Sequence, residues 1–233
     1  MSAFVIGSLY TRVTYLERGT STVAKAAENG NVAGDSAGEA GQGELATADN
    51  LPEVTKDDHV KGNLDARILL VEYSDLECPF CQRFHPTAQQ AVDEYGGQVA
   101  WVFRHFPLSF HANAQKMAEA SECAAELDGE EGFWNFVDIV FERGAMNGTS
   151  FTDDQVVGLA TEIGLNKNKF TECYDSGRYS QLVQDQMVGG QNTGVTGTPG
   201  NILLDTKTGE TRLIPGAVPY EQLKLVIDEL LQN

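Results

Sequence analysis

Two cysteines separated by two residues, Cys78-Pro79-Phe80-Cys81, are the residues of this 233-residue chain best suited to chemistry. Thiols at this spacing can form a disulfide, break it again and exchange it with another molecule. Cys78 directly precedes a predicted helix that starts with Pro79, where proline is tolerated. The free N–H groups and the dipole at a helix start stabilise an anion, so we expect a lowered pKa for Cys78. Cys81, one turn further on, is placed to resolve a mixed disulfide.

Other uses of this cysteine pair are less favoured. A zinc site needs four ligands, and apart from the nearby His85 the sequence offers no second group of ligands at suitable spacing. A purely structural disulfide across such a short loop would stabilise the fold little. We therefore predict a redox pair that needs no metal and no dissociable cofactor. This interpretation requires that the two cysteines are not both buried away from solvent.

The elements around the pair must position it. Ile68–Ser74 has the β-branched and aromatic character of a buried strand. A helix is predicted from Pro79 to Tyr95, and Pro86 inside it should kink or break it. A second strand is expected over residues 98–105.

The rest of the chain predicts a block of helices followed by a return to strands. Apolar periodicity indicates helical segments within residues 109–191. They are expected over residues 111–127, 131–143, 153–163, 166–176 and 178–190. Strands at 201–204 and 211–214 and an amphipathic helix at 219–231 complete the chain. The order β-α-β, helices, β-β-α predicts an α/β sheet domain over residues 59–233, interrupted by a helical subdomain at about 107–191.

Composition excludes several classes of protein. The formal net charge of −18 argues against a nucleic-acid binder, which needs a basic face to neutralise phosphates. Four cysteines in a chain of this length are too few for a disulfide scaffold.

The N-terminal part differs from the rest in composition. Residues 1–19 hold an apolar run that is too short to span a bilayer, and they predict a short helix. This helix is either a remnant of a membrane anchor or an ordinary N-terminal helix. Residues 20–58 are rich in Ala, Gly and acidic residues and contain no aromatic residue, so we expect a disordered acidic linker.

Three segments together resemble the DsbA-type thiol–disulfide oxidoreductases, which have a thioredoxin fold with a helical insertion. The segments are LVEYSDLECPFC, FRHFPLSFHANAQ and GVTGTPGNILL, and the resemblance covers residues 59 to the C-terminus. The resemblance implies that Pro199 is a cis-proline facing the cysteines and that Thr198 precedes it. This loop would bind an extended substrate polypeptide by its backbone. Pro79 and Phe80 would also contact the substrate.

The resemblance also assigns roles to more distant residues. Glu72 occupies the position where the family has an acidic residue that shuttles the proton of the second cysteine. A buried carboxyl with a raised pKa suits that role, whereas a solvated Glu72 at the sheet edge is the alternative. Asp75 and Glu77 are expected to be exposed. Phe80 replaces the histidine of the family's type member, which implies weaker oxidising power.

The remaining cysteines, Cys123 and Cys173, lie in the predicted helical block. Several relatives carry a pair at similar positions, so the resemblance implies a second, structural disulfide between them. Two buried free thiols are the alternative.

The sequence therefore predicts a thiol–disulfide oxidoreductase for extracytoplasmic protein substrates, acting as a dithiol oxidase. The expected partners are unfolded or partly folded proteins with cysteines and a membrane protein that reoxidises the pair. The location would be the periplasm or cell surface, with an N-terminal tether to the membrane as one version. A disulfide reductase or isomerase with the same site remains open. A binding or chaperone module on a thioredoxin fold, with incidental cysteines, is the alternative of another class.

Overall fold

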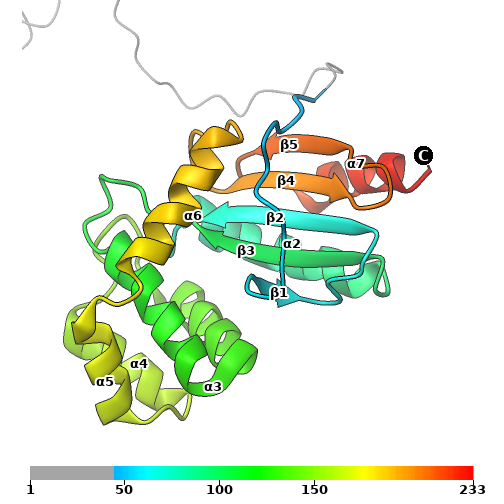
Figure 1. Ribbon diagram of the computed structural model, residues 1–233. Helices are drawn as coiled ribbons and strands as arrows, with labels where there is room; N and C mark the ends of the chain where they lie inside the picture. Colours follow the sequence, from blue (N-terminus) through cyan, green and yellow to red (C-terminus); the bar gives the residue numbers. More distant parts are fainter. Residues whose placement is uncertain (1–44, 233) are drawn as a thin grey trace, which may run out of the picture. The chain divides into compact units, whose positions relative to one another are not determined.

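The computed structural model describes residues 45–232, which form one five-stranded sheet with helices on both faces (Figure 1). The strand order is β1-β3-β2-β4-β5, and only the β2–β3 pair is parallel among neighbouring strands of this sheet. The strands are β1 (His59–Lys61), β2 (Ile68–Ser74), β3 (Val99–His105), β4 (Gly200–Asp205) and β5 (Thr211–Pro215). The expected N-terminal helix, and the linker as far as residue 44, lie outside the described residues.

The helices follow the predicted order and confirm the interrupted sheet domain. Four of them stand between β3 and β4. The helices are α2 (Pro79–Glu94), α3 (Ala114–Arg143), α4 (Asp153–Glu162), α5 (Lys167–Ser176), α6 (Ser180–Asn192) and α7 (Tyr220–Gln232). The short edge strand β1 is an addition that the sequence pattern did not predict.

The two faces of the sheet are covered differently. Alternate residues of β2 project to opposite sides, as in any strand. Ile68 and Leu70 pack in the main core, to which α2, α7 and the helical insertion also contribute. Leu69 and Val71 belong to a smaller apolar cluster on the other face, which α6 and the N-terminal described segment cover (Figure 1). The cysteine helix α2 therefore lies over the larger core.

The prediction of a break at Pro86 needs correction. α2 continues through Pro86 without a break. Its buried residues Phe84 and Ala88 lie on both sides of the proline, and their packing outweighs one missing helical hydrogen bond. The helices expected at 111–127 and 131–143 are confirmed as the two halves of α3, which non-helical dihedrals at Asp128 and Gly129 separate. Glycine suits this point because its φ of +62° is unfavourable for other residues.

Residues 45–58 do not fit the expected disordered linker. The backbone N–H of Leu213 in β5 donates to the carbonyl of Ala46 at 2.7 Å. The buried guanidinium of Arg104 in β3 contacts the Asp58 carboxylate at 2.7 and 3.1 Å. The sheet face that α6 covers only in part gives this segment apolar surface to cover, which its composition alone could not reveal.

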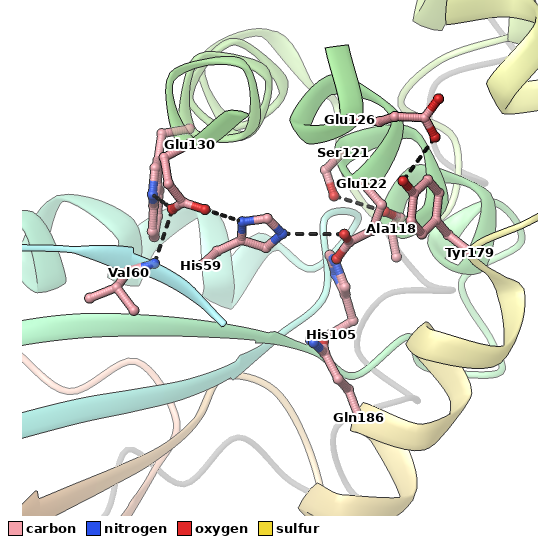
Figure 2. A network of polar contacts seen from close by, with 11 residues as sticks. His59, Val60, His105, Ala118, Ser121, Glu122, Glu126, Glu130, Tyr179 and Gln186 are labelled. Atoms are coloured by element: carbon pink, nitrogen blue, oxygen red, sulfur yellow. Dashed lines mark hydrogen bonds and ion pairs between the residues drawn. The ribbon is translucent and has the colours of Figure 1, made fainter. Parts of the chain in front are cut away.

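A buried polar cluster joins the sheet to the helical insertion (Figure 2). His59 of β1 contacts Glu130 through Nδ1 at 2.8 Å and Glu122 through Nε2 at 3.3 Å. His105, at the end of β3, contacts the other Glu122 oxygen at 3.0 Å. The His59 ring also stacks on Phe133, with ring centroids 3.5 Å apart. Both halves of α3 are thus tied to the sheet edge.

The charges in this cluster stabilise one another. Burial lowers the pKa of His59, but the hydrogen bonds and charges of Glu122 and Glu130 outweigh this and raise the pKa to about 9. Burial raises the pKa of Glu122, but its contacts with His105 and His59 outweigh this and lower the pKa to about 2. The stabilisation from His59 is full below pH 6.5 and is lost as the pH rises through 9. The stabilisation from Glu122 is full above pH 4.5 and is lost as the pH falls through 2.

We expect Glu122→Gln to lower the free energy of unfolding by about 3 kcal/mol at pH 6, because it leaves buried His59 with a weaker partner. The difference from the wild type should shrink as the pH approaches 9, where His59 loses its charge in the wild type. Urea unfolding at both pH values measures this. Glu131→Gln, an exposed change on the same helix, is the matched control. An equal loss at both pH values would contradict the assigned charges.

Candidate active site

Cys78 lies at the N-terminal end of α2, where the sequence placed it. Its dihedrals are extended (φ −85°, ψ 122°), and Pro79 occupies the first turn of the helix. The thiol of Cys78 donates to the carbonyl of Thr198 at 3.5 Å, so the loop before β4 lies against the reactive sulfur. Cys81 is fully buried in the first turn, and both cysteines are thiols in the structure.

The pKa values of the two thiols are shifted in opposite directions. The hydrogen bond from the Cys81 thiol is the largest cause that lowers the pKa of Cys78, to about 6. Burial opposes this shift, while Thr198 and the backbone N–H groups of Phe80 and Cys81 add to it. Burial raises the pKa of Cys81 well above its ordinary range, and the nearby Cys78 thiolate adds to the effect. Near neutral pH the pair therefore consists of one thiolate and one thiol.

The expectation of an accessible pair is wrong for the structure as it stands. Cys78 is only 2% exposed and Cys81 is fully buried. Pro79 is half-buried beside them, and Phe80 is 51% exposed. The contact of the Cys78 sulfur with the Thr198 carbonyl is part of this cover.

We expect alkylation of Cys78 by iodoacetamide to rise with pH around a midpoint near 6, because only the thiolate reacts. The plateau rate should lie below that of an exposed thiol, since the sulfur is covered. Mass spectrometry after digestion locates the modified residue, and Cys81 should stay unmodified. In Cys81→Ala the midpoint should move to higher pH, because the main hydrogen bond to the thiolate is lost. An unchanged midpoint in that variant would contradict this assignment.

The loop before β4 combines with the end of β5 to form a groove. The Thr198–Pro199 peptide bond is cis. Thr198 is half-buried and Pro199 is buried. A pocket of about 320 Å³ lies along this loop, between it and residues Leu213 to Gly216. Backbone atoms and apolar side chains line the groove, which suits an extended polypeptide.

Glu72 lies on β2, on the face that carries the main core, and it is fully buried. Burial raises its pKa to about 8, and the Ser74 hydroxyl and Trp101 indole lower it by smaller amounts. The Glu72 charge in turn raises the pKa of Cys81, so the two side chains are neighbours. A carboxyl with this pKa is mostly protonated at neutral pH and can both give and accept a proton.

Asp75 and Glu77, which we expected to be exposed, are buried. Asp75 accepts hydrogen bonds from the Glu77 backbone at 2.7 Å, the Leu108 backbone at 2.8 Å and the His111 ring at 2.8 Å. Glu77 accepts from the Asn113 backbone at 2.8 Å. Both carboxylates therefore tie the turn before Cys78 to the loop before α3. Their partners in that loop lie more than thirty residues away, so the local sequence gave no signal for this role.

Cys123 in α3 and Cys173 in α5 form a disulfide, with Cα atoms 5.8 Å apart. Both residues are buried. This bond lies in the helical insertion and connects two of its helices across 50 residues of sequence. The two free thiols of the described chain are those of the Cys78–Cys81 pair.

Comparison with known proteins agrees with this geometry. The profile of a family described as Thioredoxin matches residues 54–229. The chain is also similar to the Na(+)/H(+) antiporter NhaA 1 of Salinispora arenicola, with 32% identity over 144 residues, which are 61% of this chain and 21% of that protein. The NhaA 1 of Mycolicibacterium vanbaalenii is 43% identical over 87 residues, which are 37% of this chain and 14% of that protein. The chain thus spans at most about a fifth of the length of these curated relatives. Within residues 45–232, no helix combines the length and apolar character needed to cross a bilayer.

Solved structures confirm the predicted fold. DsbA2 of Pseudomonas aeruginosa superposes with a TM-score of 0.66 at 27% identity, covering 76% of this chain and 97% of that protein. Oxidised BdbD of Bacillus subtilis superposes with a TM-score of 0.68 at 23% identity, covering 82% of this chain and all of that protein. The sheet interrupted by helices is therefore the arrangement found in DsbA-like proteins.

Proposed function

The chain belongs to the thioredoxin family, and from this and the chemistry of its cysteine pair we propose that it is a protein thiol–disulfide oxidoreductase acting through Cys78 and Cys81. The observation that carries the proposal is the difference in acidity between the two thiols. A pKa of about 6 makes Cys78 a thiolate at neutral pH, while Cys81 remains a thiol. A redox pair needs this division between one attacking sulfur and one resolving sulfur.

The proposed reaction oxidises two substrate thiols. In the oxidised enzyme, a substrate thiolate attacks Cys78 of the Cys78–Cys81 disulfide. The S–S bond breaks, a mixed disulfide forms, and Cys81 leaves as a thiolate that takes up a proton. A second substrate thiolate then attacks the substrate sulfur of the mixed disulfide, and Cys78 leaves as a thiolate. The substrate has lost two electrons, and the enzyme pair holds them.

The site residues have separate roles in this reaction. Glu72 gives the proton that Cys81 takes up when it leaves. The backbone of Thr198 and Pro199 binds the substrate as an added strand, and Phe80 and Pro79 contact it beside the reactive sulfur. The buried Cys78 reacts when the Thr198 loop opens, and the backbone of an incoming substrate replaces the contacts that the loop gives up.

We propose the oxidase direction for this pair. A lowered pKa at Cys78 stabilises the reduced form at neutral pH, which makes the disulfide a better oxidant. Phe80 carries no positive charge to strengthen this effect. Equilibration with glutathione tests the direction, and we expect a reduction potential above that of thioredoxin, about −270 mV. A value at or below that figure would favour a disulfide reductase, and efficient reshuffling of scrambled disulfides would favour an isomerase.

The proposed setting is outside the cytoplasm. The substrates would be unfolded or partly folded proteins with cysteines, and a membrane protein would reoxidise the pair after each turnover. The proposed location is the periplasm or the cell surface, and one version of the proposal adds a tether to the membrane through the N-terminus. Capture of mixed disulfides with a Cys81→Ser variant in cells would identify both kinds of partner. Binding of unfolded proteins that is unaffected by loss of both cysteines would instead favour the binding or chaperone module.

A further inference from the structure

Four polar side chains buried beneath the cysteine pair carry atoms that have no hydrogen-bond partner among residues 45–232. They are Glu72 and Ser74 of β2, Trp101 of β3 and Asn201 of β4, and each is at most 1% exposed. Both Glu72 oxygens, Ser74 Oγ, Trp101 Nε1 and Asn201 Oδ1 are unpaired in the described part of the chain. Buried polar atoms in proteins almost always have a partner, so a group of unpaired ones at one place requires an explanation.

The β-sheet register brings these side chains together. Glu72 lies directly opposite Asn201 in the antiparallel β2–β4 pair. Side chains of opposite residues project to the same face, with Cβ atoms about 4.5–5.5 Å apart. Ser74 lies two residues along β2 and therefore on that face as well. Cys81 is next to this group, because the Glu72 charge raises its pKa and the Ser74 hydroxyl lowers it.

Asn201 extends from this group to the surface groove. Its Nδ2 donates to the carbonyl of Gly216 at 3.0 Å, and the N–H of Gly216 donates to the carbonyl of Pro199 at 2.8 Å. Gly216 and Pro199 both line the groove along the Thr198 loop. Because Nδ2 is held by Gly216, Oδ1 is the atom left for the groups on the Glu72 side.

We propose that Asn201 is a positioning residue for Glu72: it holds a water molecule between its Oδ1, the Ser74 hydroxyl and the Glu72 carboxyl, and this water passes protons to and from Glu72. A buried water needs two to four polar partners, which this group supplies. The proposal rests on the proposed function. When a substrate thiolate breaks the Cys78–Cys81 bond, Cys81 leaves with the electron pair and takes the Glu72 proton. Glu72 is then a carboxylate, and the water held by Asn201 delivers a proton from solvent to it.

Few other ionisable groups face Glu72. From α2 these are Cys78 and Cys81, both of which influence its charge. From β3 the packing residues are aromatic, and the side of α7 that packs on the core is apolar, with Leu223 and Ile227. The pH dependence of proton return can therefore be attributed to Glu72 and the two cysteines.

The test is the rate at which dithiothreitol reduces the oxidised protein, measured by stopped flow between pH 5 and 9. We expect Asn201→Leu and Glu72→Gln each to slow this reaction about tenfold at pH 7 and to flatten its dependence near pH 8. Glu72→Gln removes the proton donor, and Asn201→Leu removes the water that holds the Glu72 carboxyl in position to protonate the leaving Cys81. Asn201→Leu should have no further effect in the Glu72→Gln background, since both changes interrupt one route. The alkylation rate of Cys78 in reduced Asn201→Leu, which involves no leaving sulfur, should stay within about twofold of the wild type.

Asn201→Ser separates this role from a structural one. Like leucine, serine lacks the amide that bonds Gly216, but its hydroxyl can still hold a water. We expect Asn201→Ser to recover most of the rate. The proposal would be overturned if the Asn201→Ser variant were reduced as slowly as Asn201→Leu. Additive effects of Asn201→Leu and Glu72→Gln on the rate would overturn it as well. If the wild type itself does not exchange disulfides with dithiothreitol, the proposed function fails, and the inference fails with it.

Discussion

Replacing Cys78 by serine abolishes disulfide exchange, with an expected loss of at least about a thousandfold in rate, because a serine can neither form the Cys78–Cys81 disulfide that oxidises the substrate nor supply a thiolate at neutral pH. The thiol of Cys78 has a pKa of about 6, so nearly the whole population is the reactive thiolate at pH 7. Oxidation of a reduced, unfolded protein with several cysteines measures the rate. The high pKa of Cys81 and its full burial prevent it from replacing Cys78 as the attacking group.

Cys81→Ser is the matched change, and it should give a different product. The Cys78 thiolate can still attack a disulfide of an oxidised substrate protein, whose S–S bond breaks as one of its sulfurs leaves as a thiolate. No second thiol of the enzyme then releases Cys78, so a mixed disulfide with Cys78 accumulates. Non-reducing electrophoresis and mass spectrometry identify it. Both variants should fold with nearly unchanged stability, because the loop between the cysteines is very short. Equal activity of Cys78→Ser and the wild type would refute the assigned nucleophile, and failure of Cys81→Ser to trap any substrate would remove the enzyme hypothesis.

Removing the disulfide in the helical insertion should cause the largest loss of stability. Cys123 and Cys173 are 50 residues apart in sequence, and closing a loop of that size restricts the unfolded chain by about 4 kcal/mol on the loop-entropy description. The double variant Cys123→Ala, Cys173→Ala should therefore lower the free energy of unfolding by about that amount. Denaturant unfolding in non-reducing buffer measures this difference.

The matched control is the double variant Cys78→Ala, Cys81→Ala, which removes two cysteines that close only a tiny loop. It should lose disulfide exchange and keep most of the stability. The Cys123→Ala, Cys173→Ala variant should show the reverse when it is assayed below its unfolding transition. If both double variants lose equal stability, loop closure is not the reason for the effect of the Cys123–Cys173 bond.

Local sequence determined the core of the redox site. A buried strand, a short turn, a cysteine and then proline at a helix start define where Cys78 must lie, because these signals act within a few residues of one another. The strands at Ile68–Ser74 and Val99–His105 were also predictable, since their apolar runs need no distant information. The order of the helices and strands was also predictable from the sequence pattern. Thr198, Pro199 and Glu72 were found through family resemblance, not through their own local pattern.

Tertiary structure decided what surrounds those residues. Asp75 and Glu77 look solvent-exposed in sequence, but their partners come from the loop before α3 and bury them. The packing of residues 45–58 depends on a sheet face that α6 covers only in part. Asn201 gains its place opposite Glu72 only through the register of β2 and β4. Each of these features depends on contacts between residues far apart in the chain, where composition and periodicity carry no information, whereas the reactive cysteine depends on a helix start that its nearest neighbours encode.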